Sequence, residues 1–167
     1  MTSTDQNGLE ARIASLESRI RSLEDQVAIY QLLARYAPSV DSRSKASTAA
    51  LWTADGSYDY GGAPLAGAIA VGGLVDQEPH VGYVAKGSAH AIGMPLVQID
   101  GDRAVATGYS QLYVKQEDGW KVERASANRW ELVRTTNGWR VHQRINRMLD
   151  GSAEGRELLS QGIGETR

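Results

Sequence analysis

The chain of 167 residues contains no cysteine, so it can form neither a disulfide nor a thiolate metal site. Its formal net charge is only -2 and its basic residues are dispersed, which argues against nucleic acid as a partner because phosphate binding needs clustered Lys and Arg. No apolar run approaches the roughly 20 residues of a membrane span, and the N-terminus lacks the apolar centre of a signal peptide. These absences predict a cytoplasmic protein that binds neither nucleic acid nor membrane.

Phenylalanine is also missing, so four Trp and seven Tyr must supply the aromatic core, and each of them brings a polar atom into it. The three histidines are far apart in the sequence and match no metal-ligand spacing. There is no phosphate loop, dinucleotide fingerprint, nucleophile elbow or zinc-protease motif. We therefore expect no metal and no cofactor.

The N-terminal third is predicted to be helical. Segment 1–8 is polar and predicted to be disordered, and a helix follows over 9–36 that ends before Pro38. Its apolar residues recur at steps of four and three and form a heptad seam: Leu9, Ile13, Leu16, Ile20, Leu23, Val27 and Tyr30. Either the whole helix packs on its own domain, or its first part, 9–23, projects and self-associates.

The remainder is predicted to be a second helix and then a sheet. Asp41 or Ser42 would cap a helix ending near 51–52, followed by a short strand at 57–60, a loose helix at 65–74 and a loop at 76–86. Three hairpin-type turns then join four strands at 88–99, 103–116, 120–135 and 139–148. Strands this long must coil, so we expect one α+β domain over 9–150, with helices packed into a strongly curved, mainly antiparallel sheet. The tail, 151–167, is polar and predicted to be mobile.

Two strands carry candidate functional side chains. His90 shares its face, by alternation, with Ile92, Met94 and Leu96, of which Ile92 and Leu96 are expected inside. Alternation on the last strand separates one face (Trp139, Val141, Gln143, Ile145) from a polar face (Arg140, His142, Arg144, Asn146). An unbroken polar row either faces water or lines a wet pocket.

Several segments together resemble a known family. The first is segment 23–60, in which Tyr36 is followed five residues later by Asp41 and then by Ala-Leu-Trp-Thr-Ala-Asp-Gly-Ser-Tyr-Asp-Tyr. The second is the block around His90, and the third is the Ile-Asp-Gly-Asp turn at 99–102. The last is Val-Arg-Thr-Thr-Asn-Gly-Trp-Arg-Val-His-Gln-Arg at 133–144. Over about residues 24–150 the chain resembles the SnoaL-like branch of the nuclear-transport-factor-like superfamily. It is most similar in pattern to the lyases bile-acid 7α-dehydratase, scytalone dehydratase and hexachlorocyclohexane dehydrochlorinase.

The resemblance implies a cone-shaped fold around a deep pocket and a cofactor-free reaction that depends on a His–Asp pair. His90 matches the base, Asp41 the carboxylate that orients it, and Tyr36 and Arg144 groups that stabilise developing charge. The expected partner of Arg144 is Asp41 or an ordered water. Further substrate-binding candidates are Tyr60, Tyr58, Met94, which stands where many relatives have Asn, and His142, which is also the next candidate for the base.

These residues predict a lyase, either a dehydratase or a dehydrohalogenase, acting on a small, mostly apolar cyclic molecule. Histidine suits proton abstraction near neutral pH, and Tyr and Arg suit the charge that develops on an oxygen or halide. Two alternatives stay open: an isomerase or polyketide-cyclase-like enzyme using the same base, and a non-catalytic binding or assembly module. A homo-oligomer is expected, a trimer from the resemblance or a dimer from the heptad seam.

Overall fold

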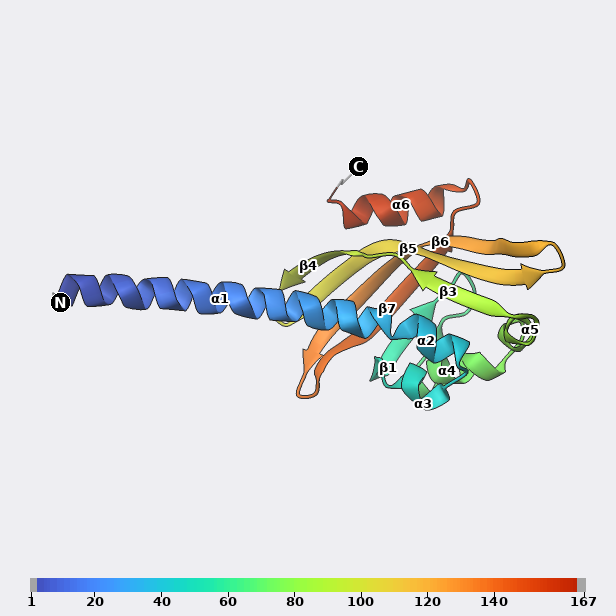
Figure 1. The fold of residues 1–167 in the computed structure, drawn as a ribbon, viewed down its shortest axis with the longest axis horizontal. Coiled ribbons are helices and arrows are strands. Elements are labelled where there is room, and N and C mark those ends of the chain that lie inside the picture. Colours follow the sequence, from blue (N-terminus) through green and yellow to red (C-terminus); the bar gives the residue numbers. More distant parts are fainter. Residues whose placement is uncertain (1–2, 165–167) are drawn as a thin grey trace.

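The computed structural model describes residues 3–164, so the outermost residues of the two predicted disordered or mobile ends lie outside the described part. Helix α1 (Ser3–Ala34) starts within the segment that we expected to be disordered, and its first turns project away from the rest of the molecule (Figure 1). Only its last part, with Ile29, Leu32 and Leu33, is buried against the domain. No helix among residues 3–164 is both long and apolar enough to cross a membrane.

The predicted second helix is the short helix α3 (Lys45–Ala49), and a helix that was not predicted, α2 (Tyr36–Asp41), precedes it and contains Pro38. Arg43, with a φ of 54°, adopts the left-handed conformation between them, which ends α2 directly after Asp41. Ser44 caps α3 by accepting a hydrogen bond from the Ser47 N–H at 3.3 Å. The expectation that Asp41 or Ser42 caps this helix was therefore wrong, and the Asp41 carboxylate is available for another contact.

The segment between the helices and the main strands contains more structure than expected. The strand predicted at 57–60 is the end of β1 (Trp52–Asp59), and the loose helix at 65–74 is β2 (Leu65–Ala66) followed by α4 (Ala68–Gly73). The predicted loop at 76–86 contains a 3₁₀ turn, η1 (Leu74–Asp76), and helix α5 (His80–Lys86).

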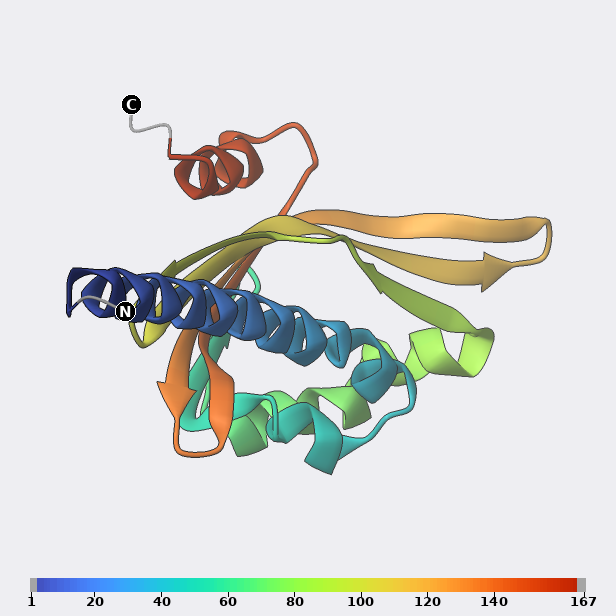
Figure 2. The same ribbon diagram turned by 60° about the vertical axis from the view of Figure 1, so that its left-hand side comes forward.

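The sheet has seven strands in the order β2-β1-β7-β6-β5-β3, and β4 also pairs with β5. The later strands are β3 (Ser88–Ile92), β4 (Leu96–Asp100), β5 (Arg103–Gln116), β6 (Gly119–Thr135) and β7 (Gly138–Met148). All pairs are antiparallel except β1 with β7, which is parallel. The α+β class, the curved and mainly antiparallel sheet and its three tight turns are confirmed, although the sheet is not closed (Figure 2).

The strand predicted at 88–99 is two strands, because Pro95 has no N–H for the ladder. This break changes the orientation of the residues after it. Ile92 packs against the core as expected, whereas Leu96 is 49% exposed and Met94 82% exposed. The prediction that Leu96 lies inside was wrong.

A bulge in β7 corrects the predicted faces of the last strand. Glu131 pairs with Gln143 and Leu132 pairs with Val141, so β7 has an extra residue, His142, at this point. The extra residue inverts the alternation. Arg144 and Asn146 therefore join Trp139 and Val141 on the buried side, away from Arg140 and His142.

The polar tail forms helix α6 (Ala153–Gly162), which lies across the outer face of the sheet, opposite the other short helices (Figure 2). Leu158 and the helix glycines are buried there. A Cβ at Gly162 would overlap the Thr107 side chain, so the helix can lie close to β5 only because this residue is glycine. The expectation of a mobile tail was therefore wrong for this segment.

Candidate active site

Asp41 and His90 meet where the end of α2 crosses β3. Asp41 Oδ1 lies 2.6 Å from the ring nitrogen Nδ1 of His90, and Asp41 Oδ2 accepts a hydrogen bond from the backbone N–H of His90 at 2.8 Å. Nδ1 therefore carries the proton when the ring is neutral, and the other ring nitrogen, Nε2, is left to accept one. The structure thus brings together the two residues that were predicted as base and orienting carboxylate.

The surroundings of Asp41 favour its charged form. Burial raises its pKa, but the hydrogen bonds from the His90 ring and backbone, together with the charges of His90 and His80, lower it by more. The net result is a pKa below the ordinary value, so the group is a carboxylate at neutral pH.

His80, in α5, is buried behind this pair and was missed because it fell in a predicted loop. Its Nε2 lies 2.8 Å from the Val40 carbonyl oxygen, and its ring centroid is 5.7 Å from that of His90. Burial lowers the pKa of His80, while the hydrogen bond to Val40 opposes this shift only in part. His80 is therefore neutral at pH 7 and donates Nε2–H to Val40, which fixes the end of α2 beside Asp41.

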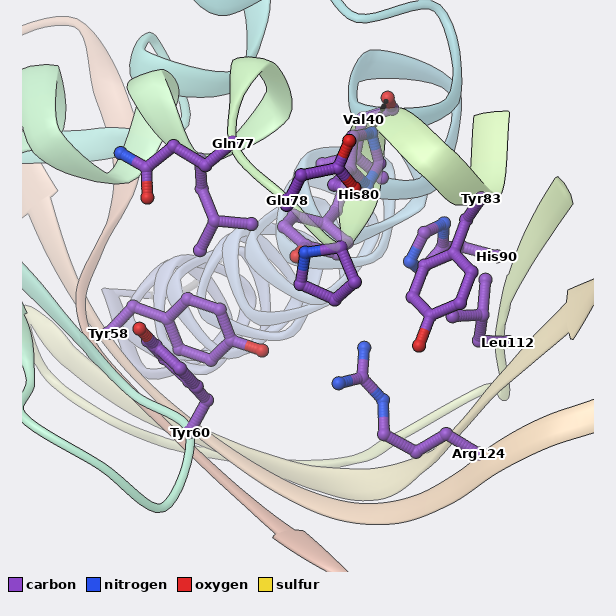
Figure 3. A pocket seen from close by; sticks show the side chains of 13 residues that line it. Val40, Tyr58, Tyr60, Gln77, Glu78, His80, Tyr83, His90, Leu112 and Arg124 are labelled. Atoms are coloured by element: carbon purple, nitrogen blue, oxygen red, sulfur yellow. Dashed lines mark hydrogen bonds between the residues drawn. The ribbon is translucent and has the colours of Figure 1, made fainter. Parts of the chain in front are cut away.

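A cavity of about 100 Å³ lies between the helices and the curved sheet, and His90 forms part of its wall (Figure 3). Three of the predicted tyrosines, Tyr36, Tyr58 and Tyr60, line it. Five further polar or aromatic residues line the cavity and were not predicted from the sequence: Gln77, Glu78, His80, Tyr83 and Arg124. The exposed segment from Gln77 to Pro79 forms the rim.

Two predicted substrate contacts lie elsewhere. Met94 projects on the outer side of the sheet, in a groove beside α6. His142 sits on the β7 bulge with its side chain 45% exposed, and its Nδ1 is 4.0 Å from Asp55 Oδ1. Neither residue lines the cavity that contains His90, so the structure does not bring them together with the other predicted site residues.

Arg144 is 2% exposed and lies beneath the tyrosines of the cavity wall. Its Nε and Nη2 donate to Asn128 Oδ1 at 3.1 and 2.7 Å, so its side-chain partner is Asn128 and not Asp41. The guanidinium carbon lies 4.3, 4.5 and 4.1 Å from the ring centroids of Tyr36, Tyr58 and Trp130. Arg144 therefore positions the aromatic wall and does not itself line the cavity.

Tyr58 reaches the cavity from β1 and remains protonated at neutral pH. Burial raises its pKa to about 12, against an opposing effect from Arg144. A protonated phenol can donate a hydrogen bond to a ligand.

Arg124 enters the cavity from β6 (Figure 3). None of the hydrogen bonds or ion pairs that the structure records within residues 3–164 involves its side chain. One sequence signal pointed to it: counting back by twos from Trp130, residues 128, 126 and 124 are all polar and occupy the inward face. Within residues 3–164, no group of three or more His, Asp or Glu side chains could hold a metal ion.

The family model for the SnoaL-like domain matches residues 21–145. The chain belongs to the SnoaL-like family. Comparison with curated proteins finds no match.

Solved structures of similar proteins agree with this assignment. An NTF2-like protein with a cystatin-like fold from Novosphingobium aromaticivorans is 39% identical, with 87% of this chain and 96% of that chain covered and a TM-score of 0.85. A protein from the same organism, described as a suspected aromatic ring hydroxylase, is 25% identical, with 76% and 90% covered and a TM-score of 0.60. Aln2 from a Streptomyces species shares the fold at 22% identity, with 74% and 90% covered and a TM-score of 0.67.

Substitution of Arg144 tests its role in supporting the cavity wall. We expect Arg144→Lys to lower the free energy of unfolding by about 2–4 kcal/mol, because an ammonium keeps the buried charge but loses the paired contact with Asn128 and the stacking. Arg144→Met should cost less, since it also removes the charge. Urea denaturation measures both, and a Lys variant more stable than the Met variant would contradict this role.

The lowered pKa of His80 predicts a specific pH dependence of stability. As pH falls below its ordinary value of 6.5, the unfolded chain binds a proton before the folded chain does, so stability decreases. We expect wild type to lose more unfolding free energy between pH 7 and 5 than His80→Gln, by at most about 1.4 kcal/mol per pH unit. Urea denaturation at several pH values makes the comparison, and equal slopes in the two proteins would argue against a neutral His80.

Proposed function

We propose that this SnoaL-like protein is a cofactor-independent lyase that removes water or hydrogen halide from a small, mostly apolar cyclic substrate. The observation that supports this most directly is the Asp41–His90 pair, whose imidazole lies in the wall of a cavity that is also lined by tyrosines and by Arg124. Such a site can remove a proton on one side and stabilise negative charge on the other.

The reaction begins when His90 Nε2 takes a proton from a substrate carbon. The electrons of the broken C–H bond form a new C=C bond, and the leaving oxygen or halogen departs with the electrons of its own bond. Asp41 stabilises the imidazolium that forms on His90 and keeps the ring oriented. Tyr58 and Arg124 stabilise the charge on the leaving group or on a carbonyl oxygen conjugated with the reacting carbon.

An isomerase or cyclase is the second candidate. Its reaction would begin with the same proton abstraction by His90, so the arrangement of His90 supports it as well as it supports a lyase. Once His90 holds the proton, its Nε2–H can return it to a different carbon without any further group. Mass spectrometry of the product after incubation in D₂O distinguishes the candidates. A lyase product is lighter than the substrate by the mass of water or hydrogen halide, whereas an isomerase product keeps all the heavy atoms of the substrate and incorporates deuterium. A cavity that binds ligand but promotes no exchange would indicate the non-catalytic module.

Substitution of the dyad tests the proposal. Once a thermal-shift screen of cyclic ketones, hydroxysteroids and polyketide-like aromatics has identified a substrate, His90→Gln should lower turnover by about 10²–10⁴. Asp41→Asn should cost nearly as much, because the amide can select the wrong tautomer of His90. His142→Gln, outside the cavity, is the matched control, and full activity in His90→Gln would mean that the base is elsewhere.

Arg124 is expected to stabilise the charge that develops during turnover. Arg124→Met should reduce kcat by about 10²-fold, the usual cost of losing one such donor, while Arg124→Lys restores activity only in part. Arg103→Met, an exposed arginine at a distant turn, serves as control. Steady-state kinetics would contradict this role if Arg124→Met changed KM alone, since Arg124 would then bind substrate and transition state equally.

A further inference from the structure

The projecting part of α1 carries a stripe of apolar side chains that its own domain leaves uncovered. Each of these residues is between 46% and 61% exposed: Leu9, Ile13, Leu16, Ile20, Leu23 and Val27. The residues that α1 buries against its domain, Ile29, Leu32 and Leu33, come later and occupy other helical positions. The expectation that this whole helix packs on its own domain is therefore not met, and the stripe faces solvent.

The domain holds α1 by the side opposite the stripe. Both carboxylate oxygens of Asp25 accept hydrogen bonds from Arg134, at 2.6 and 2.7 Å, and Asp25 Oδ1 also accepts one from Trp139 Nε1 at 3.0 Å. Asp25 lies two residues from Leu23 and from Val27, both in the stripe, and points instead to the β6–β7 hairpin. This clamp fixes the direction in which the stripe faces.

The order of apolar residues in the stripe is that of a two-stranded coiled coil. Ile13, Ile20 and Val27 occupy the first core position of successive heptads, and Leu9, Leu16 and Leu23 occupy the second. β-branched residues at the first position with Leu at the second favour two parallel strands over three.

The charges that flank the stripe select the partner and its direction. Arg12 and Arg19 precede the first core position, and Glu17 and Glu24 follow the second. In a parallel, in-register pair, Arg12 of one helix faces Glu17 of the other and Arg19 faces Glu24. An antiparallel pair would bring arginine against arginine and glutamate against glutamate.

We propose that α1 pairs with α1 of a second copy of this chain as a parallel, in-register coiled coil over residues 9–30, which makes the protein a homodimer. The dimer places both domains at the same end of the coiled coil. Because α1 contributes no residue to the cavity that contains His90, dimerisation and the proposed chemistry can fail independently.

Light scattering on the full chain tests the assembly. At tens of micromolar we expect a dimer for wild type and a monomer for the double variant Leu16→Glu with Leu23→Glu, with unchanged unfolding by urea. The matched control, Ser15→Glu with Ser22→Glu, adds the same charge on an exposed face of α1 away from the stripe and should remain a dimer. A wild-type monomer would leave the stripe to a different partner, and a wild-type trimer would exclude the two-stranded geometry; either overturns the proposal.

The absence of native cysteine allows a direct test of orientation. Leu9→Cys lies near one end of the stripe, so only a parallel, in-register pair brings it against its own copy. Mild oxidation should link this variant into a covalent dimer, whereas the outward-facing Ser22→Cys should remain largely unlinked. Equal linking of both variants, or none in Leu9→Cys, would overturn the parallel arrangement.

Discussion

The rest of the site depends on the contact between the carboxylate of Asp41 and His90. One of its oxygens binds the His90 ring and the other binds the His90 backbone, so one residue both attaches α2 to β3 and selects the tautomer of the candidate base. The left-handed Arg43 ends α2 at this point. Its side chain then contacts the carbonyl of Val75 and the carboxylate of Asp76, which holds the turn that leads to His80. The local backbone and the orientation of the imidazole are therefore set together.

Because the chain has no phenylalanine, tyrosine and tryptophan form the aromatic wall of the cavity and the cluster beneath it. Tyr36, Trp52 and Trp130 contact one another mainly at their edges, and the guanidinium of Arg144 lies among the aromatic rings beneath the cavity. Asn128 Oδ1 accepts from Arg144 and also from Asn146 at 2.9 Å, so an amide oxygen and not a carboxylate binds the guanidinium. The result is a wall rich in hydrogen-bond donors in the cavity that contains His90. This polarity suits a substrate that loses a proton on one side and gains negative charge on the other.

The sequence predicted the parts of the fold that depend on local pattern. The hairpin turns were identified from their Asp-Gly and Asn-Gly pairs, and the pairing of Asp41 with His90 followed from the family resemblance. The faces of β7 could not be predicted, because the bulge at His142 adds one residue and alternation alone does not reveal it. Helix α6 was missed for a different reason: the tail is polar and showed no helical pattern, and the close contact of Gly162 with Thr107 that holds the helix is not visible in the sequence. Both errors come from tertiary contacts that override local preference.

Strand β6 separates the two surfaces to which we assign functions. Arg124 enters the cavity near its start, and Arg134 holds Asp25 of α1 near its end. At about 3.3 Å per residue, the ten residue steps from Arg124 to Arg134 span roughly 33 Å along the strand. One route by which assembly could influence chemistry runs along this strand, whose interior is fixed by buried Asn128 and Trp130. A shorter route runs from α1 through Arg35 into α2, which carries Tyr36 and Asp41. Rigid packing of this kind transmits a displacement only if the packed elements have a second arrangement. The clamp and the cavity therefore lie near opposite ends of one strand, and the proposed coiled coil would act on the site only if α2 or β6 had such a second arrangement.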